Sequence, residues 1–132
     1  MMRTLWTALA FALVLPTMPA KALGQMTIKA LYSYCATTAR EQDRSFCLGY
    51  INGAAAVMFS NGEHREDINL HSAVNLACNP GRTITGAAMV QAFRNWVVKY
   101  TAKNPEFWNY PAETGVADAI NEAWPCPSVK GD

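Results

Sequence analysis

The sequence predicts an all-α protein, a small bundle of four main helices stapled by two disulfides. Apolar residues recur at helical spacing in four segments, and no segment shows convincing alternation with a period of two. Four cysteines, an even number, follow a predicted export signal, as is typical of small disulfide-bonded domains. Together these observations favour helices packed around one modest core.

Residues 1–22 predict a cleaved secretory signal. Arg3 follows the two initial methionines, an apolar core covers residues 4–16, and Ala20 and Ala22 supply the small residues of a cleavage site. The apolar core is short for a membrane span, so an uncleaved anchor is the less favoured alternative. We expect residues 23–132 to form a single domain that is exported and soluble.

The first two helices follow from apolar spacing and capping residues. Helical spacing places the first helix at residues 26–37, through the apolar positions Ile28, Leu31, Tyr32 and Cys35. A charged connector follows, in which Asp43 or Ser45 can cap the second helix. We expect that helix to end near Ser60, because the dipeptide Asn61-Gly62 favours a left-handed stop.

The second helix is expected to be the centre of the bundle. Residues 45–59 are apolar nearly all round, and such a helix must be covered on several sides. Gly49, Gly53 and Ala54 predict a shallow groove in which a neighbouring helix approaches closely. We expect this surface to be internal packing, with a homodimer seam as the alternative.

A polar run and a chain break precede the third helix. The polar run (residues 63–69) should be solvated, and residues 70–76 can hold a turn or two of helix before the break at residues 78–81. Thr83 or Thr85 can cap the third helix, which we expect over residues 86–103. Its apolar positions are Met89, Phe93, Trp96, Val97 and Tyr100. The basic residues expected to face outward are Arg94, Lys99 and Lys103.

The final helix follows a short aromatic connector (residues 106–110). Asn104-Pro105 should end the third helix, and Pro111 suits the first turn of the fourth. The expected buried stripe consists of Val116, Ala119, Ile120, Ala123 and Trp124. Residues 125–127, with two prolines, should stop the helix.

All four cysteines lie in the predicted mature part, at positions 35, 47, 78 and 126. No pair has the C-x-x-C spacing of a redox centre or a zinc ribbon, and three pairings into two disulfides can be drawn. We favour Cys35–Cys47, which would clip a helical hairpin, and Cys78–Cys126, which would tie the middle of the chain to its end. In the chain-entropy model the longer loop contributes more, about 3–4 kcal/mol.

Composition and motifs argue against several classes of function. Without Arg3 and Lys21, the predicted mature chain has nine basic and ten acidic residues and therefore a net charge of −1. A charge near zero does not suit nucleic acid or an anionic membrane as partner. The nucleophile-elbow, phosphate-loop and zinc-protease motifs do not occur. We therefore predict no catalytic residues, no metal and no cofactor.

Two groups of side chains come closest to a chemical site. The only plausible metal cluster is His64 and His71 with nearby acidic residues, but their spacing matches no helical ligand pair, and we interpret them as exposed loop residues. Asp118 and Glu122 lie one turn apart, opposite the apolar stripe of the last helix, so a solvated surface is expected there.

Two stretches suit a binding protein. The polar run offers His64, Arg65, Glu66 and Asp67, although an ordinary solvated loop would look the same. The aromatic connector offers Phe107, Trp108 and Tyr110. These three aromatics either close the end of the bundle or face outward as an interface hot spot.

A series of short motifs resembles the Rap/Tai family, exported immunity proteins of Gram-negative bacteria. The motifs are Cys47-Leu48-Gly49-Tyr50-Ile51-Asn52-Gly53, Cys78-Asn79-Pro80, Val97-Val98-Lys99-Tyr100 before Asn104-Pro105-Glu106, Pro111-Ala112 and Trp124-Pro125-Cys126. Their order and spacing cover nearly the whole predicted mature chain. Two positions depart from the family pattern: Asn79, where many relatives carry an apolar residue, and Asn104, where a histidine is common.

The resemblance implies a periplasmic location and a function as well as a fold. Family members are small disulfide-stapled helical domains, often dimeric, and characterised ones block a peptidoglycan-cleaving amidase delivered by a type VI secretion system. Inhibition would be occlusion of the amidase active site, with no chemistry on this chain. The alternative is a periplasmic structural or stress-related helical protein without a toxin partner.

Overall fold

Four α-helices and one short 3₁₀ helix make up the fold in the computed structural model, which describes residues 24–37, 39–64 and 76–127. The α-helices are α1 (Ile28–Ala36), α2 (Glu41–Glu63), α3 (Gly86–Thr101) and α4 (Ala112–Ala123), and the 3₁₀ helix η1 (Pro105–Asn109) lies between the last two. No strand occurs in these ranges, where the only β-type pairing is an isolated bridge between Thr27 and Pro111. The predicted all-α bundle of four main helices is confirmed.

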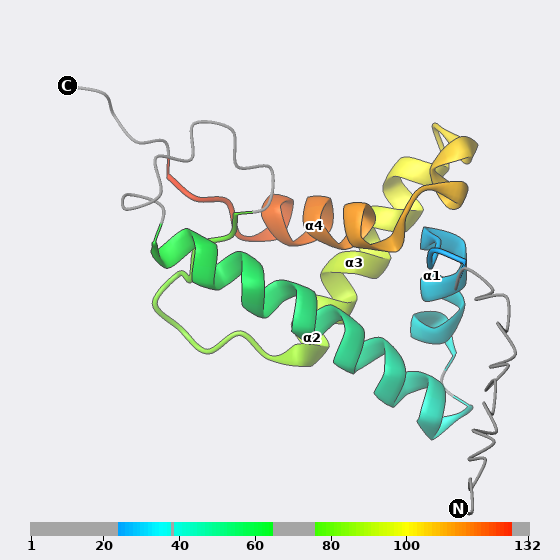
Figure 1. Ribbon diagram of the computed structural model, residues 1–132, viewed down its shortest axis with the longest axis horizontal. Coiled ribbons are helices and arrows are strands. Elements are labelled where there is room, and N and C mark those ends of the chain that lie inside the picture. The colour runs from blue at the N-terminus through cyan, green and yellow to red at the C-terminus, as the bar shows by residue number, and fades with distance from the viewer. Residues whose placement is uncertain (1–23, 38, 65–75, 128–132) are drawn as a thin grey trace, which may run out of the picture.

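The helices pack as one bundle in which every α-helix contacts the other three. Figure 1 shows α4 lying along the middle of α2, α3 passing behind both, and α1 at the end where α2 begins. The core draws on all four helices and on Ala77; its largest fully buried side chains are Phe93, Ile28, Leu31, Ile51, Ile120, Val97, Val116 and Cys47. Burying each of the larger aliphatic or aromatic side chains stabilises the fold by about 1.5–3 kcal/mol.

Both favoured disulfides are present. Cys35–Cys47 joins the end of α1 to the start of α2, and Cys78–Cys126 joins the segment before α3 to the chain after α4, with Cα–Cα distances of 5.1 and 4.8 Å. The described residues contain no free cysteine. The prediction of a helical hairpin clipped by the first bridge is therefore confirmed.

The predicted boundaries of α2 are wrong at both ends. The helix begins at Glu41 rather than after a cap at Asp43 or Ser45, because the two acidic residues of its first turn, Glu41 and Asp43, suit the positive end of the helix dipole. It also continues through Asn61-Gly62 to Glu63. The other helices begin and end within about two residues of the prediction, and Thr85 caps α3 by accepting from the N–H of Ala88 at 3.2 Å.

Gly62 serves close packing instead of a left-handed turn. The backbone of Ala77 crosses α2 at this point, where its N–H donates to the Met58 carbonyl at 3.2 Å. A Cβ added at Gly62 would collide with the Ala77 carbonyl oxygen. Among the described glycines only Gly81 has a positive φ, of 78°. The glycine in Asn61-Gly62 is thus required by a neighbouring segment of chain that the local sequence does not reveal.

The expectation that α2 is covered on several sides is met only in part, because α2 contacts α1, α3 and α4 but keeps one side open. Its fully buried positions form one stripe, Cys47, Ile51, Ala55, Met58 and Gly62. On the opposite side a Cβ built at Gly49 or Gly53 meets nothing within 4 Å, and Val57, at the edge of this side next to α4, is 61% exposed. The predicted internal packing at Gly49 and Gly53 does not occur, because α1, α3 and α4 all lie on the other side of α2.

Three residues at the two ends of α4 also differ from the prediction. Pro111 is the N-cap of α4 rather than part of its first turn, and its carbonyl accepts from the N–H groups of Thr114 and Gly115. Ala123, expected in the buried stripe, is exposed, and Trp124 is half-buried against Phe59, with ring centroids 6.0 Å apart.

Other predicted features lie outside the described residues. These are the signal peptide, Arg65, Glu66 and Asp67 of the polar run, and most of the expected helical turn at residues 70–76. Within the described ranges, none of the helices combines the length and apolarity that crossing a bilayer requires.

Two glycine-to-alanine variants of α2 should change stability in opposite directions. Gly62→Ala should lower the free energy of unfolding by about 1–3 kcal/mol, because the added methyl group must displace the Ala77 backbone. Gly53→Ala should raise it by about 0.5–1 kcal/mol, because alanine favours a helix interior and space is open there. Urea denaturation at low micromolar concentration measures both, and a Gly62→Ala protein as stable as the parent would contradict the packing argument.

Candidate functional site

His64 is the only one of the predicted polar-run contacts that the structure describes. It is exposed and follows the last residue of α2, where its Nδ1 lies 2.9 Å from the Ser60 carbonyl oxygen. This contact is local and helps to satisfy the carbonyl end of the helix. Among the described residues no three histidine, cysteine or acidic side chains form a group that could hold a metal ion.

The aromatic connector folds back onto the bundle. The Phe107 ring stacks parallel to that of Trp96, with centroids 6.3 Å apart, and Trp108 meets Tyr32 edge-on at 5.4 Å. Both connector side chains are half-buried. These two residues therefore close the end of the bundle, which is the plainer of the two interpretations offered for them.

Tyr110 behaves differently from its two neighbours. Its ring leans on Phe107 at 5.0 Å, yet the residue remains 45% exposed. Its backbone is held in place, because the Tyr110 carbonyl accepts from the N–H of Ile28 at 2.9 Å. An aromatic ring on a fixed backbone loses little conformational freedom on binding, which suits an interface contact.

A groove opens beside the same aromatic residues, between α1 and η1. Its volume is about 500 Å³, and it is lined by Lys29, Tyr32, Ser33, Pro105, Trp108 and Asn109. Two half-buried aromatic rings and a proline make most of the surface apolar, while Lys29 and Asn109 add polar groups. Concave apolar surfaces with a few polar groups are the usual form of a binding site.

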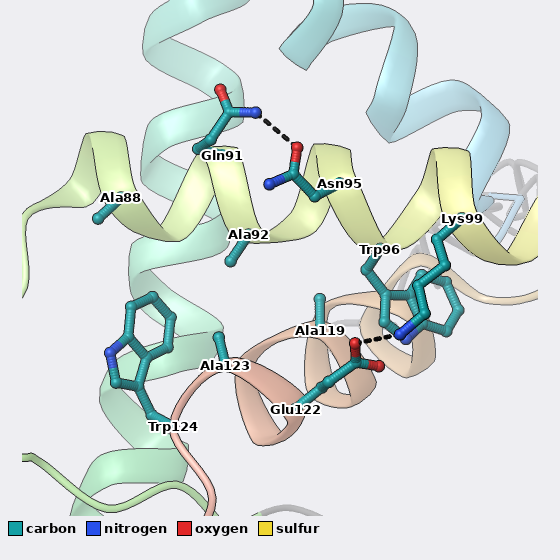
Figure 2. A pocket seen from close by; sticks show the side chains of 10 residues that line it. All are labelled: Ala88, Gln91, Ala92, Asn95, Trp96, Lys99, Ala119, Glu122, Ala123 and Trp124. Carbon is teal, nitrogen blue, oxygen red and sulfur yellow. Dashed lines mark hydrogen bonds and ion pairs between the residues drawn. The ribbon is translucent and has the colours of Figure 1, made fainter.

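A second groove, between α3 and α4, was not anticipated from the sequence. Figure 2 shows alanines of both helices facing into it, with Trp96 near one end and Trp124 near the other. The signal that could have found it is the i, i+4 spacing of Ala88 and Ala92 on α3, matched by Ala119 and Ala123 on α4.

The charged groups of this α3–α4 groove already neutralise one another. Lys99 Nζ lies 2.6 Å from Glu122, and the Tyr100 hydroxyl donates to the same carboxylate at 2.7 Å. The hydrogen bond to Glu122 raises the pKa of Lys99, and the bonds from Lys99 and Tyr100 lower the pKa of Glu122. Because all three groups are satisfied within the protein, the groove offers a partner little net charge.

Asp118 lines a further groove, of about 420 Å³, between α2 and α4. The other residues around it are Ala54, Val57, Met58, Glu113, Thr114 and Ala117. Asp118 is half-buried rather than fully solvated as expected, whereas Glu122 is exposed. Burial raises the pKa of Asp118, and repulsion from Glu122 adds to this effect.

Comparison of the sequence with known protein families gives a match over most of the chain. The family model described as Rap1a immunity proteins matches residues 27–126, a span that includes all four α-helices and all four cysteines. Comparisons with curated proteins and with solved structures find no match.

Asp118→Asn should stabilise the protein at neutral pH. A raised folded-state pKa means that ionisation costs more in the folded protein than in the unfolded chain, so stability is lost as pH rises through the ordinary aspartate range. Asparagine removes that loss. We expect a gain below about 1 kcal/mol at pH 7, because the group is partly exposed to screening solvent.

The gain should shrink at pH 3, where Asp118 is protonated in both states. Thermal unfolding at the two pH values measures it, with the exposed Glu106→Gln as a control for the change in net charge. An equal gain at both pH values would contradict the role assigned to ionisation.

Proposed function

Because the chain belongs to the Rap1a immunity protein family, we propose that it acts in the periplasm as an immunity protein of a type VI secretion system. Its partner in this proposal is a peptidoglycan-cleaving amidase, which it binds and occludes. The family membership also confirms the resemblance noted in the sequence motifs. Immunity proteins of this kind need no catalytic group, because covering the active site of the toxin is enough.

The observation that carries the proposal is the extent of the family match. Residues 27–126 include the buried stripes of all four helices and both disulfides, so the scaffold as a whole is that of the family. An immunity protein implies a cognate effector protein as partner. The two disulfides support action outside the cytoplasm, since such bonds persist in oxidising compartments.

The surface proposed to meet the amidase is the aromatic end of the bundle. Its exposed element is Tyr110, and the adjoining groove presents the Tyr32 and Trp108 rings between α1 and η1. The four residues of the polar run, His64, Arg65, Glu66 and Asp67, are proposed as a second contact. An interface of ordinary size would bury about 800 Å² on each partner.

Rigidity favours such an interface. Tyr110 lies between η1 and α4, and main-chain hydrogen bonds tie this junction to the start of α1: Ile28 N–H donates to Tyr110, and Ala112 N–H donates to Met26 at 2.8 Å. A contact surface ordered before binding loses less conformational entropy when the complex forms.

The first test is binding and inhibition. Oxidised protein from residue 23 onward should bind an amidase encoded next to its own gene. At equimolar concentration it should abolish peptidoglycan cleavage by that enzyme. An amidase that remains active, with no complex by size-exclusion chromatography, would contradict the proposal. It would leave a periplasmic structural protein without a toxin partner as the better interpretation.

The contact surface has its own test in the same assay. Tyr110→Ala should weaken binding of the amidase by about 30-fold, equivalent to about 2 kcal/mol, as is usual for an aromatic hot spot. Val98→Ala, an exposed apolar position on α3, is the matched control and should bind normally. Unchanged affinity of the Tyr110→Ala protein would move the interface away from the aromatic end.

We also propose that two copies of the chain pair through the outer face of α2. Residues 45–61 contain no charged side chain, and Phe46, Gly49, Gly53 and Val57 on this side are exposed. The glycines would allow two helices to approach closely. Sedimentation equilibrium should give twice the monomer mass, and Val57→Glu should give the monomer; a parent protein that is monomeric at high concentration would exclude the pairing.

A further inference from the structure

A basic pocket lies where α2 and α3 meet around the first disulfide. Its volume is about 330 Å³, and it is lined by Cys35, Thr37, Arg44, Cys47, Leu48, Ala87, Val90, Gln91 and Arg94. Cys35 and Cys47 form a covalent bond, so the wall between α1 and α2 is held in one geometry. The disulfide therefore fixes one wall of the pocket before any partner binds.

Arg94 is the unusual residue of this basic pocket. We expected it to face outward from α3, but the residue is half-buried, and its Nε atom is buried without a hydrogen-bond partner among the described residues. A buried donor of a charged group that lacks a partner is costly, and proteins rarely leave one unsatisfied. Because Nε is closed to solvent, a ligand in the pocket would meet the remaining nitrogens of this guanidinium group, which lines the pocket wall.

A second guanidinium group strengthens the argument. Arg44 comes from the first turns of α2 and lines the same pocket from another helix. No acidic residue lines the pocket, and the ion pairs between described residues are Arg40–Asp43 and Lys99–Glu122, which involve neither arginine. The basic pocket thus carries two positive charges that nothing in the described parts of the chain neutralises.

The rest of the lining is apolar and partly open. Leu48 is 40% exposed at the pocket, and Ala87, Val90 and the disulfide complete the apolar walls. A small inorganic anion would leave these walls uncovered. A carboxylate attached to an aliphatic neighbour would satisfy both the guanidinium groups and the apolar surface.

We propose that this pocket receives an aspartate or glutamate side chain of the effector, together with an adjacent aliphatic residue. The proposal rests on the proposed immunity function for the identity of the partner. A guanidinium group matches a carboxylate with two parallel hydrogen bonds, which fixes the orientation of the partner as well as adding affinity. Arg94, which extends from α3, and Arg44, which extends from α2, would hold one carboxylate between them.

The pocket can be tested without the effector. Blocked dipeptides provide matched probes: acetyl-Leu-Glu-amide carries the carboxylate, and acetyl-Leu-Gln-amide replaces it with an amide of the same shape. Titration is followed by NMR at the side-chain Nε–Hε signal of Arg94. We expect a saturable shift with the glutamate probe and binding at least about tenfold weaker with the glutamine probe, because charge-assisted hydrogen bonds are the stronger ones.

Substitutions test which arginines of the pocket bind the carboxylate. Arg44→Gln, at an exposed helical position, should abolish the saturable shift at Arg94. Arg94→Lys, followed instead at the side-chain Nε–Hε signal of Arg44, should weaken the binding because it keeps the charge but loses the planar fork. Arg82→Gln, an exposed arginine outside the pocket, should have no effect. A parent protein that gives no saturable shift, or the same shift with both probes, would overturn the pocket assignment.

The second part of the test measures how tightly the pocket variants bind the effector. The affinity of the amidase should fall about tenfold for Arg44→Gln and Arg94→Gln, equivalent to the loss of one charge-assisted contact, and stay unchanged for Arg82→Gln. Normal affinity of both pocket variants would overturn the assignment to the effector. If the parent binds no amidase, the proposed function fails, and the dipeptide titration still decides whether the pocket binds a carboxylate.

Discussion

The crossing of residues 76–78 between α2 and α4 is the constraint on which the arrangement of the helices depends. Three main-chain groups of this short segment are bonded to its neighbours: Ala77 N–H to Met58, Cys78 N–H to Trp124, and the Leu76 carbonyl to the side chain of Asn121. Gly62 lets the segment lie against α2, and the Cys78–Cys126 bridge locks it to the end of α4. The crossing therefore holds the C-terminal ends of α2 and α4 in a fixed relation to each other.

The opposite end of the bundle is organised by the chain before α1. Residues 26–28 pair with the junction between η1 and α4 through main-chain hydrogen bonds, and the aromatic connector packs between α1 and α3. As a result, Tyr110 and the groove of Tyr32 and Trp108 stand on rigid elements. The proposed immunity function would depend on such pre-ordered surfaces, because each flexible contact would subtract from the affinity.

Three grooves of the bundle differ mainly in how their charges are satisfied. Between α3 and α4, Lys99 and Glu122 neutralise each other. Between α2 and α4, Glu113 and Asp118 are both acidic, and burial already disfavours the charge on Asp118. Around the first disulfide, Arg44 and Arg94 are both basic, with no acid in the lining. A near-neutral chain can therefore present local surfaces of opposite sign, and composition alone conceals this.

Local sequence by itself determined the helices, the all-α class and the general placement of the aromatic connector. Those features depend on spacing along one segment: apolar residues three and four apart, threonine caps such as Thr85, and the proline that follows Asn104. Three disulfide pairings are possible for four cysteines, and the topology of the predicted helices favours the one that is observed. The order of the short motifs along the chain also indicated the family.

Only the tertiary structure decided which faces are covered and which groups are left unsatisfied. Asn61-Gly62 predicts a helix stop, yet Ala77, distant in sequence, makes Gly62 a packing position inside the helix. The helical pattern predicts a solvated Arg94, yet its Nε atom is buried where α3 meets α2 near the first disulfide. Burial and pairing depend on contacts between segments far apart in the chain, and the local periodicity of one helix carries no information about them.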